Sequence, residues 1–163
     1  MLTDSGLPPK DGAAPYMTAP AEIQLHFAST DMSVRQALIR LLAQLARHVP
    51  DQDDLGRVEI VVAEALNNVV EHAYCSAGMG PVDLRCRFGC GRLFVTIGDE
   101  GVPVPQAILV PEVVQAPLPL PEELPEGGWG WMLIRELTEN LSYHRVGGRN
   151  ELTLEMLVSI SDS

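Results

Sequence analysis

Two adjacent segments with alternating apolar residues constrain the fold more than any other feature of the sequence. The link between them, Gly89-Cys90-Gly91, is short and rich in glycine, which predicts a tight β-hairpin. Each strand of this hairpin has one apolar face, which other elements must cover. The alternating residues are Val82, Leu84, Cys86 and Phe88 in the first segment and Leu93, Val95 and Ile97 in the second.

The other segments alternate between strand and helix periodicity. Ser29 or Asp31 is placed to cap the first helix, and Asp51–Asp54 supplies the N-cap of the second. The result is an α/β (α+β) two-layer sandwich, in which a mixed, largely antiparallel sheet is covered on one face by about three helices. Besides the hairpin, we expect a strand from residue 21 and a first helix that ends near residue 50. Two further helices are expected at 55–74 and 131–139. Two strands are expected at 141–145 and 151–158, joined by Gly147-Gly148.

Two stretches fall outside this pattern. Residues 1–20 contain several prolines and glycines without periodicity, which predicts a flexible tail before a domain at 21–160. Residues 102–126 are rich in proline and contain no Lys, Arg, Ser or Thr. A loop of this length inside a compact domain is typical of a lid or a binding loop, so we expect a lid at about 102–127.

Composition narrows the classes of function. The 163-residue chain carries a net charge of −11 and has no basic stripe, which argues against direct nucleic-acid binding. Three cysteines do not form a disulfide framework, and we expect Cys86 in a strand and Cys90 in a turn. No apolar run approaches the ~20 residues of a membrane span. The N-terminus does not read as a secretory signal, so we expect a cytoplasmic protein.

Three polar residues follow one side of the second predicted helix. Glu64, Asn68 and His72 are four residues apart, so an α-helix places them on one stripe beside its apolar face. A carboxylate can accept a proton from a hydroxyl, and an amide oxygen is a suitable ligand for Mg²⁺. The stripe alone is more typical of a solvated helix edge.

Two glycine-containing turns complete the candidate site. Asp99-Glu100-Gly101 follows a strand, where the carboxylate could accept a hydrogen bond from an exocyclic amine and the glycine permits close backbone approach. The turn from Gly127 to Gly130 enters a helix, whose first amides can hold phosphate oxygens. Each turn is a weak signal by itself.

Together, and in this order, the three segments resemble the ATP-binding motifs of GHKL (histidine-kinase-like, Bergerat-type) ATPases. The stripe Glu64-x-x-x-Asn68-x-x-x-His72 resembles the N box, Asp99-x-Gly101-x-Pro103 the G1 box, and Gly128-x-Gly130-Trp131 the G2 box. The resemblance covers residues 21–158. The short length and the Pro-rich lid are similar to those of the anti-sigma-factor serine/threonine kinases.

This resemblance implies an ATP- and Mg²⁺-dependent kinase that phosphorylates an anti-sigma-factor antagonist with a STAS-type domain and sequesters a sigma factor. It also allows a homodimer. Glu64 would be the general base and Asn68 the magnesium ligand, while His72 matches the motif but fits a structural role equally well. The remaining nucleotide contacts would come from Asp99, Gly101, Pro103, Gly128, Trp129, Gly130 and Trp131.

Alternative functions remain open. Trp129 stands where the family often has a basic or small polar residue, and the lid offers no cation, so phosphates would rely on Mg²⁺, helix amides and arginines such as Arg135 or Arg149. These departures favour a nucleotide-sensing binding module without kinase turnover. The catalytic fragment of a sensor histidine kinase is a third reading, disfavoured because residues 1–20 are too short for a dimerisation helix pair.

Overall fold

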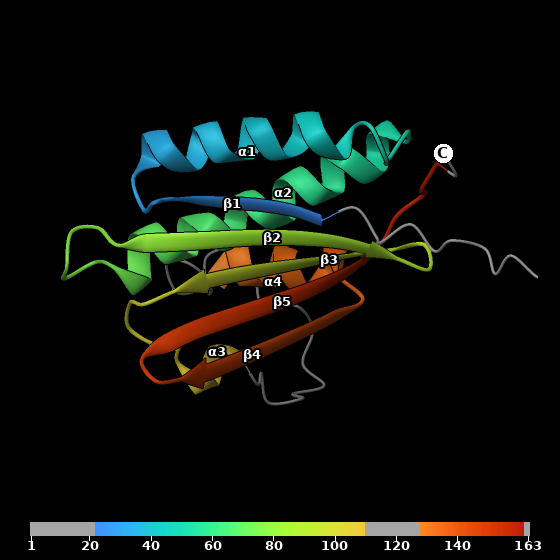
Figure 1. The fold of residues 1–163 in the computed structure, drawn as a ribbon. Coiled ribbons are helices and arrows are strands. Elements are labelled where there is room, and N and C mark those ends of the chain that lie inside the picture. Colours follow the sequence, from blue (N-terminus) through green and yellow to red (C-terminus); the bar gives the residue numbers. More distant parts are fainter. Residues whose placement is uncertain (1–21, 110–127, 162–163) are drawn as a thin grey trace, which may run out of the picture.

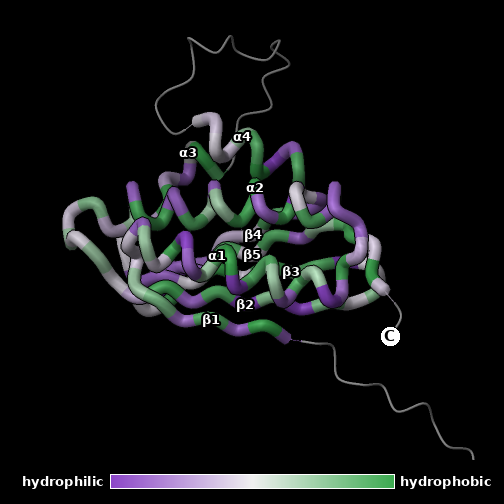
Figure 2. Tube along the Cα trace, turned by 90° about the horizontal axis from the view of Figure 1, so that it is seen from above, coloured by the Kyte–Doolittle hydropathy of each residue, from purple (hydrophilic) through white to green (hydrophobic). Residues whose placement is uncertain are grey.

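The computed structural model describes residues 22–109 and 128–161. It consists of a five-stranded sheet in the order β1-β2-β3-β5-β4, with helices on one face (Figure 1). Viewed at right angles, the strands lie on one side and α2 and α4 on the other (Figure 2). The elements are β1 (Glu22–Ala28), α1 (Asp31–Leu45), α2 (Gln52–Asn68), the π-helix η1 (Val69–Ala73), β2 (Pro81–Gly89), β3 (Arg92–Asp99), α3 (Gln106–Leu109), α4 (Gly128–Leu137), β4 (Asn140–Val146) and β5 (Arg149–Leu157).

The predicted two-layer sandwich is confirmed, with one refinement in the sheet. All four strand pairings among the described residues are antiparallel, so this part of the sheet is not mixed. Two hairpins supply the tight turns. Cys90 and Gly91 both have positive φ, as do Gly147 and Gly148, which is the backbone of a two-residue turn matched to strand twist.

The core fills the space between the sheet and the helices. The alternating residues of β2 and β3 point toward the helices and are buried, as the sequence predicts. Leu66 of α2 is fully buried, and a side chain of this size stabilises the fold by about 1.5–3 kcal/mol. The apolar arc of α2 and η1 that faces the core comprises Val58, Val61, Val62, Ala65, Leu66, Val69 and Ala73.

The N-cap predicted for α2 is present in the structure, whereas α1 has a different N-cap from the residues predicted. The side chain of Asp51 accepts hydrogen bonds from the amides of Asp53 and Asp54, so the predicted cap of α2 is confirmed. The cap of α1 is Thr30, not Ser29 or Asp31. Ser29 is buried, and its hydroxyl accepts a hydrogen bond from the amide of Gly80 instead. This tertiary contact removes Ser29 from the capping position.

Some predicted segments have different bounds in the structure, and others lie outside the residues that the structure describes. The predicted tail at residues 1–20 and most of the lid, from residue 110 to 127, lie outside the described residues. The first part of the lid contains α3, a helix that the sequence did not predict. The third predicted helix begins earlier than expected, at Gly128, so the glycine turn is its first turn.

Candidate nucleotide-binding site

Glu64 and Asn68 lie one turn apart at the end of α2, and both face the first turn of α4. Each side chain is partly exposed, at the edge of the core. A β-carbon built on Gly130 would stand 2.6 Å from Oε2 of Glu64 and 3.9 Å from Oδ1 of Asn68. The absence of a side chain at Gly130 therefore leaves room for both polar groups between the two helices.

The amide of Asn68 lacks a hydrogen-bond partner. Its Nδ2 is the one buried side-chain nitrogen or oxygen without a partner in the part of the chain that the structure describes. Leaving such a group unpaired costs about 1–3 kcal/mol, and native structures rarely tolerate it without a reason. A phosphate oxygen can accept from this nitrogen, and the amide oxygen can ligate Mg²⁺, so the residue fits a magnesium-bound nucleotide.

His72 lies beyond the end of α2. The α-helix ends at Asn68, and the following residues form the π-helix η1, whose turns contain more residues than those of an α-helix. The His72 side chain is 55% exposed, and its Nε2 lies 4.0 Å from the carboxylate of Glu71. Asn67 and Glu71 are exposed.

The turn after β3 packs against the end of η1. The amide of Val102 donates a 2.8 Å hydrogen bond to the carbonyl oxygen of Ala73. A β-carbon on Gly101 would overlap this same carbonyl, so only glycine fits there. Pro103, two residues on, is exposed. The predicted adenine-reading turn and the predicted magnesium-binding helix are thus joined directly through the backbone.

Asp99 is buried, and its carboxylate is held from two sides. Oδ1 accepts hydrogen bonds from the amide of Gly101, at 2.8 Å, and from Nδ2 of Asn150, at 2.7 Å. The Asn150 amide oxygen in turn accepts from the hydroxyl of Tyr143 and the guanidinium of Arg145. Arg145 also donates to the carbonyl of Gly101.

Asn150, Tyr143 and Arg145 are not among the site residues predicted from the sequence. The sequence carries one signal for Asn150. It occupies an inward position of β5, on the same face of the strand as Leu152 and Leu154. A polar residue in an otherwise apolar row has to find partners inside the fold. The other two residues lie on an edge strand and carry no comparable signal.

Tyr74 ties the end of η1 to both neighbouring turns. Its hydroxyl donates to the carbonyl of Pro81 and accepts from the amide of Glu100, at 2.8 and 2.7 Å. Burial, together with the nearby carboxylates of Asp99 and Glu100, raises the pKa of Tyr74 above its ordinary value. The hydroxyl therefore keeps the proton that it donates.

The two tryptophans at the start of α4 have opposite environments. Trp129 is 41% exposed, whereas Trp131 is buried and belongs to the core. Trp131 therefore anchors α4 in the core, whereas the resemblance implies that it contacts the nucleotide. Gly128 is half-buried at the first position of the helix, where backbone amides have no partner within the helix itself and can bind an anion.

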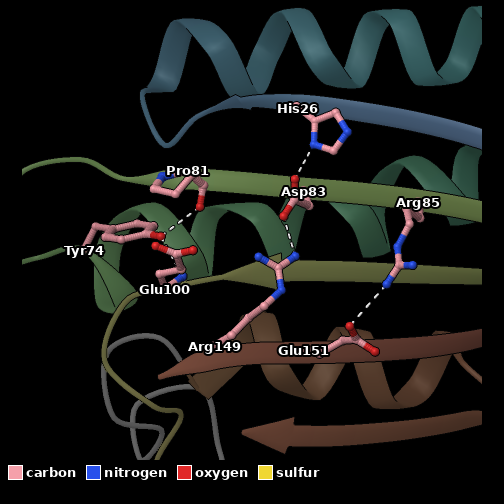
Figure 3. A network of polar contacts seen from close by, with 8 residues as sticks. All are labelled: His26, Tyr74, Pro81, Asp83, Arg85, Glu100, Arg149 and Glu151. Carbon is pink, nitrogen blue, oxygen red and sulfur yellow. Dashed lines mark hydrogen bonds and ion pairs between the residues drawn. The ribbon is translucent and has the colours of Figure 1, made fainter. Parts of the chain in front are cut away.

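The arginines expected to assist the phosphates have other partners. Arg149 crosses the open face of the sheet to pair with Asp83, which also binds His26 (Figure 3). Burial alone would raise the pKa of Asp83, but the hydrogen bonds from Arg149 and His26 outweigh it and lower that pKa. Arg135 donates to the carbonyl of Ile108, linking α4 to α3, and burial lowers its pKa.

A separate hollow of about 480 Å³ lies beside Tyr143 and is lined by the start of the lid and by β4. Tyr143 borders it and accepts a hydrogen bond from the amide of Val104. Glu64 and Asn68 do not line it. The other lining residues are Gln106, Leu109 and Leu141.

Two negative findings apply to residues 22–109 and 128–161. No group of three or more His, Cys, Asp or Glu side chains is arranged to hold a metal ion there. Within the same residues, no helix is long and apolar enough to cross a membrane.

The arrangement of α2, η1, the Asp99 turn and α4 defines a nucleotide-binding class of domain, and comparison with known proteins agrees. The family described as "Histidine kinase-like ATPase domain" matches residues 27–156, so the chain belongs to that family. This result confirms the resemblance drawn from the three sequence motifs.

Among individual proteins, the chain is similar to anti-sigma F factors. It is 26% identical to that of Bacillus licheniformis over 121 residues, which cover 74% of this chain and 81% of the relative. The relative from Geobacillus kaustophilus is also 26% identical, over 74% of this chain and 80% of its own length. The relative from Bacillus subtilis is 24% identical, over 74% of this chain and 81% of its own length.

A solved structure shares the fold. The crystal structure of the RsbU and RsbW domains of Rv1364c from Mycobacterium tuberculosis superposes with a TM-score of 0.59 at 17% identity. The match covers 86% of this chain but 32% of that chain. At this identity the similarity establishes the fold alone.

Proposed function

We propose that this protein binds ATP with Mg²⁺ between α2 and α4, phosphorylates a serine or threonine of an anti-sigma-factor antagonist with a STAS-type domain, and sequesters a sigma factor. The similarity to anti-sigma F factors over most of both chains supports the regulatory role. A cytoplasmic location and a homodimer belong to the same proposal, since a sigma factor acts inside the cell.

One observation carries this proposal: Glu64 and Asn68 converge on Gly130, and the amide of Asn68 is buried without a partner. The Asn68 side chain would hold Mg²⁺ and a phosphate oxygen, and the ion would neutralise charge on the phosphates. Glu64 would accept the proton of the attacking hydroxyl as its oxygen bonds to the γ-phosphorus and the bond to ADP breaks.

The other residues would surround the two ends of the nucleotide. Asp99 and Gly101 would contact adenine, with Pro103 at the rim of the turn. Gly128 and Gly130 would offer amides at the start of α4 to the phosphates. Trp129 would lie at the entrance, and Trp131 would hold α4 in place from the core. His72 matches the motif and would contact the nucleotide or hold the end of the helix.

Phosphate transfer is the decisive experiment. The protein is incubated with γ-labelled ATP, Mg²⁺ and a purified STAS-domain antagonist, and label on the antagonist is followed. Glu64→Gln should lower the transfer rate at least about a hundredfold, the lower range for loss of a general base, without weakening ATP binding. Glu59→Gln is a matched control, because Glu59 lies on the exposed side of α2.

A second candidate is a nucleotide-sensing module that regulates partner affinity without turnover. The exposed Trp129 at the base of the lid favours it, as does the engagement of Arg149 with Asp83 rather than with the site. This candidate predicts tight ATP binding with no label on the antagonist, in both the wild type and Glu64→Gln.

A further inference from the structure

We propose that Tyr74 is a positioning residue that links the turn after β3 to the corner where β1 meets α1, so that a bound nucleotide holds this corner closed. The corner consists of Ser29 and Thr30, which follow β1, and of Gly80, which precedes β2. The inference rests on the proposed function, because the turn after β3 would contact the nucleotide. Tyr74 itself is not among the nucleotide contacts proposed above.

The hydroxyl of Tyr74 joins two backbone segments that are distant in sequence (Figure 3). It accepts a 2.7 Å hydrogen bond from the amide of Glu100, which lies between Asp99 and Gly101. It donates a 2.8 Å hydrogen bond to the carbonyl of Pro81, the first residue of β2. The side chain is 4% exposed, and hydrogen bonds in such surroundings are stronger than those exposed to water. A restraint on the turn is therefore passed to the start of β2.

The ring of Tyr74 also lies against the backbone of Gly80. A β-carbon at Gly80 would stand 2.1 Å from a ring carbon, far inside van der Waals contact, so a side chain at this position would displace the ring. The two hydrogen bonds of the hydroxyl keep the ring from swinging away. The contact therefore makes the position of Gly80 depend on that of the ring.

Gly80 in turn holds the end of β1. The amide of Ser29 donates to the carbonyl of Gly80, and the amide of Gly80 donates to the hydroxyl of Ser29, both at 2.9 Å. Ser29 is 2% exposed and directly precedes Thr30, the N-cap of α1. This reciprocal pair therefore fixes where α1 begins. Met32, on the first turn of α1, is 66% exposed, so the link from the nucleotide turn ends at the protein surface.

Binding of a nucleotide would act on this link by restricting the turn after β3. Local segments of a folded protein open and close, and here opening breaks the hydrogen bonds between Ser29 and Gly80. A turn held by a ligand keeps the Tyr74 hydroxyl in place, which lowers the population of the open corner. Coupling of this kind changes an equilibrium without a new contact between the ligand and the corner.

Amide hydrogen exchange, followed by NMR in the full chain with and without ATP and Mg²⁺, tests the link. The reporters are the amides of residues 29 and 80, and the reference is the amide of Ser161, which donates to His48 beyond the other end of α1. The reference shows any effect of the ligand that is not specific to the corner. The variants are Tyr74→Phe, which removes the hydroxyl and keeps the ring, and Ser29→Ala, which loosens the corner. The control is Thr153→Val, on the open face of the sheet.

In the wild type and in Thr153→Val, ATP with Mg²⁺ should slow exchange at residues 29 and 80 at least about fivefold relative to Ser161, the lower range of coupling between sites. Tyr74→Phe should still bind ATP, but the slowing at residue 29 should fall to the level of the reference. Ser29→Ala should exchange faster at residue 29 in both states and keep the slowing, because its Tyr74 link is intact. A weaker corner is thereby distinguished from a broken link.

Gly80→Ala, which displaces the ring, should act like Tyr74→Phe and keeps the test available if that variant does not fold. Slowing that persists in Tyr74→Phe, or in Gly80→Ala where the first variant does not fold, would overturn the inference. Loss of the slowing in Ser29→Ala as well would also overturn it, because any weakening of the corner would then have the same effect.

A wild type that binds ATP without slowing at residues 29 and 80 would likewise contradict the link and leave the nucleotide site standing. A wild type that does not bind ATP would instead remove the proposed function on which the inference rests.

Discussion

Gly130 lies directly over the carboxylate of Glu64: a β-carbon at Gly130 would stand 2.6 Å from Oε2. The atom it would meet is the far end of a flexible side chain rather than backbone. The two residues come from helices that are separated by the sheet hairpin and the lid in sequence. The glycine therefore controls where the proposed general base can lie.

Gly130→Ala should separate stability from activity. Alanine favours a helix over glycine by up to ~1 kcal/mol, and Glu64 can turn aside, so the free energy of unfolding should stay the same or rise. Phosphate transfer should fall, because the carboxylate moves from its place. Urea unfolding and transfer assays on one preparation test this, and an active variant would show that the position of Glu64 is unimportant.

Asn68→Ala should abolish Mg²⁺-dependent nucleotide binding and leave the fold intact. The variant removes a buried amide whose nitrogen has no partner among the described residues, so folding loses little. Asn67→Ala is the matched control, because its side chain is exposed one position earlier on α2. Titration with ATP and Mg²⁺ should find normal affinity in the control. Normal affinity in Asn68→Ala would contradict the magnesium assignment.

Gly101→Ala should destabilise the protein, in contrast to Gly130→Ala. The new methyl group would overlap the backbone carbonyl of Ala73, which cannot rotate away as a side chain does. Overpacking of this kind costs about 1–3 kcal/mol. Gly56→Ala on α2 is the control, since nothing lies within 4 Å of its added β-carbon. Chemical denaturation should show a loss for the first variant and no loss for the second.

Alkaline stability should depend on Cys86. Burial raises the pKa of its thiol to about 12, whereas an unfolded thiol has a pKa of about 8.5. Above pH 8.5 the unfolded chain releases this proton first, so the folded state binds more protons and the free energy of unfolding falls as pH rises. The slope is about 1.4 kcal/mol per pH unit up to the folded pKa, and below pH 8.5 the contribution is constant.

Cys86→Val should reduce this alkaline slope. Urea unfolding between pH 7 and 10 gives the measurement, and Cys75→Ser, which changes an exposed thiol, should leave the slope unchanged. Identical slopes in the wild type and Cys86→Val would show that the thiol ionises without unfolding.

Local chemistry explains which parts of the fold could be predicted. Alternating residues in β2 and β3 specify a strand with one apolar face, and two glycine-containing turns specify the hairpins. The cap at Asp51 depends only on amides two and three residues away. These interactions are short in sequence, so the sequence reveals them directly.

Other features depend on contacts between distant segments. Ser29 is drawn away from the helix cap by Gly80, and Arg149 is drawn across the sheet by Asp83. The residues of η1 carry no local signal for a π turn, so the sequence predicts one continuous α-helix through His72. Asn150 becomes recognisable as part of the site only when β5 is seen beside Asp99.

The measurement that tests the central claim most directly is calorimetric titration of the full chain with ATP and ADP, each with and without Mg²⁺. The account predicts saturable ATP binding that is lost or strongly weakened when Mg²⁺ is removed. Absence of binding to either nucleotide would contradict it, and the ends of α2 and α4 would then serve partner contacts in a protein without a nucleotide site.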